Sequence, residues 1–180
     1  MHSQFLLNLR RGFLVTLCCF VLLGIAYPLT VTGIGQAFFT HQANGSLTKN
    51  GSTLIGQQWQ GPKWFQGRPD ADDPMATGGT NLGPRSKTLV KAVKEQIALL
   101  EKEGITPTPD LVTTSGSGVD PDITPVDAYA QVNAVAKARG LTVAVLRHLV
   151  STQIHSAQFG FLGSPYVDVL QLNEALRELR

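Results

Sequence analysis

Apolar residues dominate the start of the chain and then give way to shorter periodic patterns. Residues 12–48 contain no Lys, Arg, Asp or Glu, and 13–34 is a run of 22 mostly apolar residues. A helix of that length reaches roughly 33 Å, enough to cross a hydrocarbon core of about 30 Å. The pattern predicts one membrane-spanning helix near the N-terminus.

Helical periodicity returns in the second half of the chain. Apolar residues recur at helical spacing between Ser86 and Gly104. Thr124, Pro125 and Asp127 form an N-cap, a first-turn proline and a capping acid, which predicts a helix that ends at Gly140. A further helix is expected over about 142–156.

Short β-branched or apolar runs predict strands at 54–55, 111–113 and 167–172, and Asn173 is expected to cap a short terminal helix. The fold class is therefore α/β, with one N-terminal transmembrane helix followed by a small mixed α/β extracytoplasmic domain. The expected boundaries are a cytoplasmic N-terminus at 1–11, the transmembrane helix and its exit at 12–39, a linker at 40–52 and the soluble α/β domain at 53–180.

Charge sets the expected orientation. Arg10 and Arg11 precede the span, whereas the first charge after it is Lys49. Because positive residues near a span tend to stay in the cytoplasm, the N-terminus should lie inside and the domain outside. Residues 12–180 hold 13 basic and 13 acidic residues, since Arg10 and Arg11 account for the net charge of +2. A neutral domain without a basic run gives no electrostatic reason to bind nucleic acid or an anionic lipid surface.

A cleaved signal peptide is an alternative to the anchor, with a small-x-small cleavage site after Ala26. The apolar character continues past that point to Phe39, which is longer than a signal sequence needs and favours the anchor. Both interpretations export the domain.

Catalytic and metal-binding patterns are weak. The glycine-rich stretch 78–87 lacks the G-K-[S/T] ending of a phosphate-binding loop, and 115–118 lacks the third glycine of a dinucleotide fingerprint. Asp70, Asp72 and Asp73 begin like a calcium loop, but Met75 stands where glycine is needed, so a solvated acidic turn is preferred. We therefore expect no catalytic residue, no metal site and no intrinsic cofactor.

Several motifs in order along the chain nevertheless resemble one family, the C subunit (KdpC) of the bacterial Kdp potassium-transporting ATPase. They are F-Q-G-R-P at 65–69, G-G-T-N-L-G-P at 78–84, D-L-V-T-T-S-G-S-G-V-D-P-D-I-T-P at 110–125, A-R-G at 138–140, and L-G-x-P at 162–165 followed by V-x-V-L-x-L-N-x-A-L at 167–176. The resemblance covers nearly the whole chain. The block S-G-S-G-x-D-P-x-I-T-P is its most specific part.

The resemblance implies a non-catalytic accessory subunit of a high-affinity, ATP-driven potassium import complex in the bacterial inner membrane. Its implied partners are a channel-like potassium-binding subunit and a P-type ATPase subunit, with room for a small accessory membrane peptide. Potassium is then the transported ion of the complex. The family is described as assisting assembly and as a catalytic chaperone that promotes ATP binding by the ATPase subunit. The second role is physically harder for an extracytoplasmic domain, because ATP is scarce outside the cytoplasm.

The residues proposed to contact the partners lie in the long loop 67–84 and the turn 115–122. They are Arg68, Asn81, Ser115, Ser117 and Asp120. Two other classes stay open: an exported, membrane-tethered binding domain or enzyme acting alone, and a soluble nucleotide-binding enzyme with a buried N-terminal helix.

Overall fold

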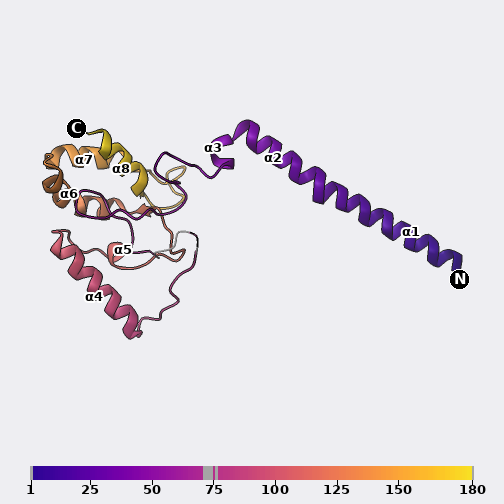
Figure 1. The fold of residues 1–180 in the computed structure, drawn as a ribbon, viewed down its shortest axis with the longest axis horizontal. Coiled ribbons are helices and arrows are strands. Elements are labelled where there is room, and N and C mark those ends of the chain that lie inside the picture. The colour runs from indigo at the N-terminus through magenta and orange to yellow at the C-terminus, as the bar shows by residue number, and fades with distance from the viewer. Residues whose placement is uncertain (1, 71–74, 76, 180) are drawn as a thin grey trace. The chain divides into compact units, whose positions relative to one another are not determined.

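The computed structural model describes residues 2–70, 75 and 77–179. The chain divides into two units, Met1–Ser46 and Leu47–Arg180. The first unit is a long helix built from α1 (His2–Cys19), the π-helical turn η1 (Phe20–Ala26) and α2 (Tyr27–Phe38), followed by the short α3 (Thr40–Ala43) (Figure 1).

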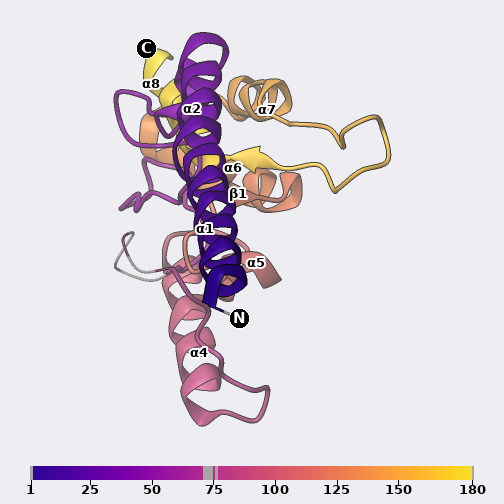
Figure 2. The ribbon, with the colours of Figure 1, turned by 90° about the vertical axis from the view of Figure 1, so that its right-hand side faces the viewer.

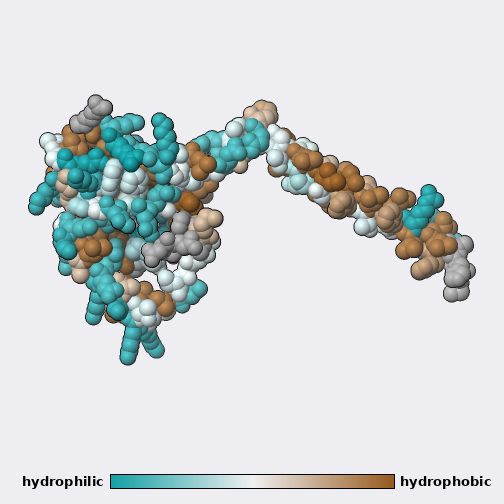
Figure 3. All heavy atoms as spheres, viewed as in Figure 1, coloured by the Kyte–Doolittle hydropathy of each residue, from teal (hydrophilic) through white to brown (hydrophobic). Residues whose placement is uncertain are grey.

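The helix of the first unit is long and apolar enough to cross a membrane over the 35 residues Gln4–Phe38, and none of these residues is buried (Figure 3). At 1.5 Å per residue it measures about 52 Å. The π-helical turn falls just before Pro28, which has no N–H to donate four residues back. At the end of this turn, the N–H of the preceding residue, Tyr27, donates to the Leu22 carbonyl, five residues back.

The regular structure of the second unit is mainly helical. Its helices are α4 (Lys87–Lys102), α5 (Pro109–Val112), α6 (Pro125–Arg139), α7 (Val143–Thr152) and α8 (Val169–Glu178). The only sheet in the described part of this unit is the antiparallel pair β1 (Asp122–Ile123) and β2 (Val167–Asp168). In Figures 1 and 2, α6, α7 and α8 lie together with this sheet, while α5 and then α4 follow on one side.

Two helices begin where the sequence predicts. The Ser86 side chain accepts a hydrogen bond from the Leu89 N–H at the start of α4. Thr124 and Asp127 form a capping box at the start of α6, and Gly140 ends that helix with a φ of +70°. Each cap satisfies groups that a helix end leaves unpaired, so these boundaries are fixed by local sequence.

The strand predictions are mostly wrong. Residues 54–55 form a turn, and 111–113 belongs largely to α5, which Thr108 and Pro109 start. The strand expected at 167–172 covers only β2, because the Asp168 side chain accepts from the Gln171 N–H and begins α8 there. Asn173 is not a cap but a buried residue inside α8. The expected helix at 142–156 ends at Thr152.

The hydrophobic core of the second unit lies between the helices and the segment around Phe65. Its fully buried side chains come from α4, α6, α7, α8 and the loops, and include Phe65, Leu100, Val132, Val135, Leu146, Val150, Leu172 and Leu176. The core therefore joins segments that lie far apart in the sequence.

Two buried side-chain amides hold the backbone at residues 65–66. The Asn173 side chain of α8 accepts from the Phe65 N–H at 2.9 Å and donates to the Phe65 carbonyl at 2.8 Å. The Gln131 side chain of α6 does the same for Gln66, at 2.7 and 3.0 Å. Both side chains are fully buried. They give the backbone of Phe65 and Gln66 the hydrogen bonds that a neighbouring strand supplies in a sheet.

Candidate functional surface

Asp70 joins the two loops that the sequence singles out. Its Oδ1 accepts from the Ser115 N–H at 2.6 Å, and its Oδ2 accepts from the Ser115 hydroxyl and from the Asp120 N–H, both at 2.7 Å. Hydrogen bonds to a carboxylate are stronger than those between neutral groups. Asp70 therefore fixes the start of the long loop against both ends of the 115–120 turn, and is not the solvated residue expected from the sequence.

The turn itself is closed by hydroxyl groups. The Ser115 Oγ accepts from the Gly118 N–H at 2.9 Å, and the Ser117 Oγ accepts from the Val119 N–H at 3.2 Å. The Gly78 N–H donates to the Ser117 carbonyl at 2.6 Å, which brings in the glycine-rich stretch. The S-G-S-G motif is thus used to build a compact loop.

Glycine is required at two close backbone contacts here. Gly118 has a φ of +72°, and a Cβ on it would lie 2.6 Å from the Gly78 carbonyl oxygen. A Cβ on Gly56 would lie 2.7 Å from the Asp120 carbonyl oxygen. The loops 56–60, 78–79 and 115–121 therefore pack backbone against backbone.

Arg68 is bound to the segment that leads into the 115–120 turn. Its Nη1 forms an ion pair with the Asp110 carboxylate at 3.0 Å, and its Nη2 donates to the Thr114 carbonyl at 3.3 Å. Of the five candidate residues, Arg68, Ser115, Ser117 and Asp120 come together around Asp70. Asn81 is exposed with a φ of +54°, and within the described ranges its side chain makes no hydrogen bond to them.

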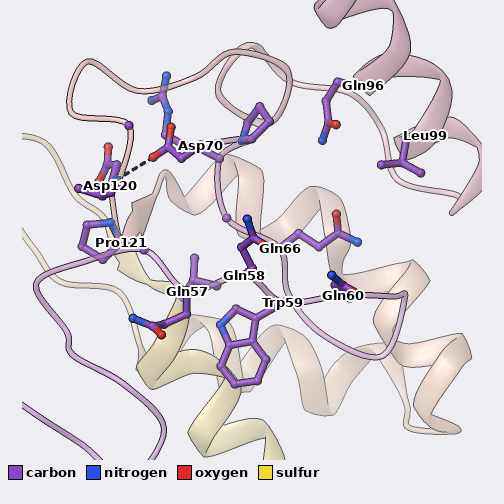
Figure 4. Close-up of a pocket in the computed structure, with 17 residues that line it drawn as sticks. Gln57, Gln58, Trp59, Gln60, Gln66, Asp70, Gln96, Leu99, Asp120 and Pro121 are labelled. Atoms are coloured by element: carbon purple, nitrogen blue, oxygen red, sulfur yellow. Dashed lines mark hydrogen bonds between the residues drawn. The ribbon is translucent and has the colours of Figure 1, made fainter. Parts of the chain in front are cut away.

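A pocket of about 630 Å³ opens beside this cluster (Figure 4). Its lining combines backbone of the 118–121 turn with Trp59 and five amide side chains: Gln57, Gln58, Gln60, Gln66 and Gln96. The charged residues in the lining are Arg68, Asp70 and Asp120. Two buried donors at the pocket, Trp59 Nε1 and Arg68 Nε, have no hydrogen-bond partner among the described residues.

Acidic groups gather next to the turn. Asp122 lies opposite Asp168 in the β1–β2 pair, and its N–H donates to Asp120 Oδ1 at 3.1 Å. Burial, together with the charges of Asp168 and Asp120, raises the pKa of Asp122 to about 6, while His155 opposes the rise. Burial also raises the pKa of Asp168. The described residues contain no group of three or more His, Cys, Asp or Glu side chains suited to a metal ion.

Sequence reasoning missed Asp70, Gln131 and Asn173 as the residues that organise this surface. Asp72 and Asp73 lie outside the described residues. Asp70 was noticed only as the start of an acidic run, because nothing local reveals that its partners lie 45 and 50 residues away.

The comparisons with known proteins agree with one another. A family model described as "KdpC: K+-transporting ATPase, c chain" matches residues 9–178. Proteins named "Potassium-transporting ATPase KdpC subunit" from Sorangium cellulosum, Koribacter versatilis and Acidobacterium capsulatum are 45%, 44% and 46% identical to this chain. The alignments cover 95%, 92% and 96% of this chain and 97%, 92% and 98% of those relatives. The chain belongs to the KdpC family, the C chains of K+-transporting ATPases.

Proposed function

We propose that this chain is a non-catalytic accessory subunit of an ATP-driven potassium import complex, which assists assembly and stabilises or gates the complex. Its N-terminal membrane-spanning helix anchors it in the bacterial inner membrane, with the N-terminus in the cytoplasm and the second unit on the extracytoplasmic face. The names of the relatives support membership of the complex. Arg10 and Arg11 before the span support the orientation.

The observation that carries the proposal is the cluster around Asp70. The side chains that most resemble a chemical site are used to hold the loops. Ser115 and Ser117 accept hydrogen bonds within their own turn, and Arg68 donates to the Thr114 carbonyl just before it. They therefore give the loops a fixed shape, which is what a recognition surface needs in order to bind without a large cost of ordering. Of the five candidate residues, Ser117 and Asn81 are exposed.

The partner that fits best is the channel-like potassium-binding subunit. The chain has no Lys, Arg, Asp or Glu between Arg11 and Lys49, so the span offers no charged path for an ion and can pack beside other helices. Conduction and ATP hydrolysis then belong to the channel-like and P-type subunits, with a small membrane peptide as a further neighbour. Contacts that differ between two states of the channel-like subunit would let the domain stabilise one state, which is gating.

Promotion of ATP binding is the second candidate function. The pocket in Figure 4 favours it, because Trp59 and the surrounding amides could hold a base. The charges oppose it: Asp70 and Asp120 outnumber Arg68 in the lining, and Arg68 is already paired with Asp110. A triphosphate would meet net negative charge there.

Protease protection of a C-terminally tagged full chain separates the two functions. Digestion in spheroplasts but not in inverted vesicles is expected, and it would leave direct ATP binding without access to cytoplasmic ATP. Digestion only in inverted vesicles would reverse the orientation and make promotion of ATP binding the leading function.

The surface itself is tested by co-purification with the other subunits and by potassium uptake from micromolar potassium. Ser117→Arg places a large charge on the exposed turn and should lower both recovery of the complex and uptake. Lys94→Ala, on the exposed side of α4, is the matched control and should change neither. Normal assembly and uptake with Ser117→Arg would contradict docking through the turn.

A further inference from the structure

A hairpin with an apolar tip projects between α7 and β2 (Figure 2). His155 and Tyr166 form an antiparallel bridge at its base, with their rings stacked 4.9 Å apart. Gln158 and Leu162 form a second bridge nearer the tip. The side chains of Phe159, Phe161 and Leu162 at the tip are 86%, 76% and 50% exposed.

The tip is unusual in charge and in backbone. Residues 156–167 contain no Lys, Arg, Asp or Glu. Phe159 has a φ of +53°, a conformation that costs a residue with a side chain about 1–2 kcal/mol and that usually belongs to glycine or asparagine. A phenylalanine kept in that conformation, with its ring in solvent, indicates a binding role for the ring.

Part of the tip's backbone is paired within the hairpin. The N–H groups of Gln158 and Leu162 donate to each other's carbonyls at 2.9 Å. Those of Gly160 and Phe161 donate to the Ala157 and Gln158 carbonyls at 3.1 and 3.2 Å. Each backbone bond formed within the hairpin lowers the polar cost of entering an apolar medium.

We infer that the tip of the 155–166 hairpin inserts Phe159, Phe161 and Leu162 into the interface of the lipid bilayer to which the chain is anchored. The span ends at Phe38 and the second unit begins at Leu47, so a short tether keeps the unit close to one bilayer surface. Uncharged aromatic and aliphatic side chains suit the boundary between headgroups and acyl chains. The hairpin then acts as a second, weaker anchor that limits how the unit turns about its tether.

This inference rests on the membrane anchoring in the proposed function, but not on the orientation or on the transport role. The test uses the full chain in liposomes of neutral phospholipid. In a Cys18→Ala/Cys19→Ala background, Phe161→Cys carries an environment-sensitive fluorophore, and Lys91→Cys on the exposed side of α4 is the matched control. A third sample keeps Cys18 and is labelled within the span.

We expect the label at residue 161 to shift to the blue and to lose roughly half or more of its emission to a quencher on the upper acyl chain. The label at residue 91 should respond only to aqueous iodide. Quenching at Cys18 but not at 161 would overturn the hairpin inference and leave the anchor intact. If 161 is exposed to iodide in liposomes but protected in the assembled complex, a protein partner binds the tip instead. Loss of lipid quenching at Cys18 as well would instead refute the anchoring.

Discussion

Asp122 and Asp168 face each other across the two-stranded sheet, in the register that makes them direct neighbours. Two carboxylates placed opposite each other repel, and Asp168 is also buried. Burial of Asp122, together with the like charge of Asp168 opposite it, means that the charged form of Asp122 destabilises the folded unit.

Asp122→Asn should therefore stabilise the folded unit at pH 7.5. The pKa of Asp122 is raised from 3.8 to about 6, so its penalty is full above pH 6 and disappears as the pH falls towards 3.8. Solvent screens this half-buried group, which reduces the expected gain to about 1 kcal/mol, or roughly 3–5 °C in Tm. Thermal unfolding of wild type and variant in detergent should differ at pH 7.5 and converge at pH 4. An equal difference at both pH values would contradict the role of the charge.

Asn173→Ala should cost about 3 kcal/mol of unfolding free energy, because it leaves the N–H and the carbonyl of Phe65 buried without partners. Glu178→Ala, exposed in the last turn of the same helix, is the control and should stay within about 0.5 kcal/mol. Denaturant unfolding measures both. If the two variants were equally stable, the amide would not be needed to hold Phe65.

Asp70→Ala should loosen the 115–120 turn without unfolding the helices. The amide protons of Ser115 and Asp120 lose their acceptor and should exchange about tenfold faster or more, while those of α6 keep their protection. Glu95→Ala removes only the exposed ion pair with Lys91 and should change none of these rates. Unchanged exchange at Ser115 in Asp70→Ala would mean that the turn is held by other contacts.

The glycines of the S-G-S-G motif should differ in their tolerance of a side chain. Gly118→Ala should lose about 2–3 kcal/mol of stability, since the positive φ and the contact with the Gly78 carbonyl oxygen act together. Gly116→Ala meets nothing within 4 Å and should stay close to wild type. Melting temperatures of the two variants give the comparison, and a Gly118→Ala protein as stable as Gly116→Ala would rule out the close approach.

Local signals explain which helices were predictable. Ser86, Thr124 and Gly140 act on groups within a few residues of themselves, so α4 and α6 are recognisable from sequence alone. Apolar runs of two or three residues do not distinguish a strand from a short helix, and this is why 111–113 was predicted wrongly. Pro109 and Asp110 carry the signal that was overlooked, a first-turn proline followed by an acidic residue.

The candidate surface was only partly predictable for a related reason. The motifs identify the two loops that matter, and four of the five candidate residues do lie together. Asp70 links them through hydrogen bonds, and its role depends on contacts with residues 45 and 50 positions away. Contact with a partner stays a prediction for all five residues.

The pairing of Phe65 with Asn173 also sets an order of events during synthesis. Phe65 cannot find its final hydrogen bonds until α8, 108 residues later, has left the ribosome. A contact that spans so much of the chain forms slowly, because the entropy cost of closing a long loop comes before the stabilisation from the contact. The second unit should therefore remain open while it is being made and close only when its last helix arrives.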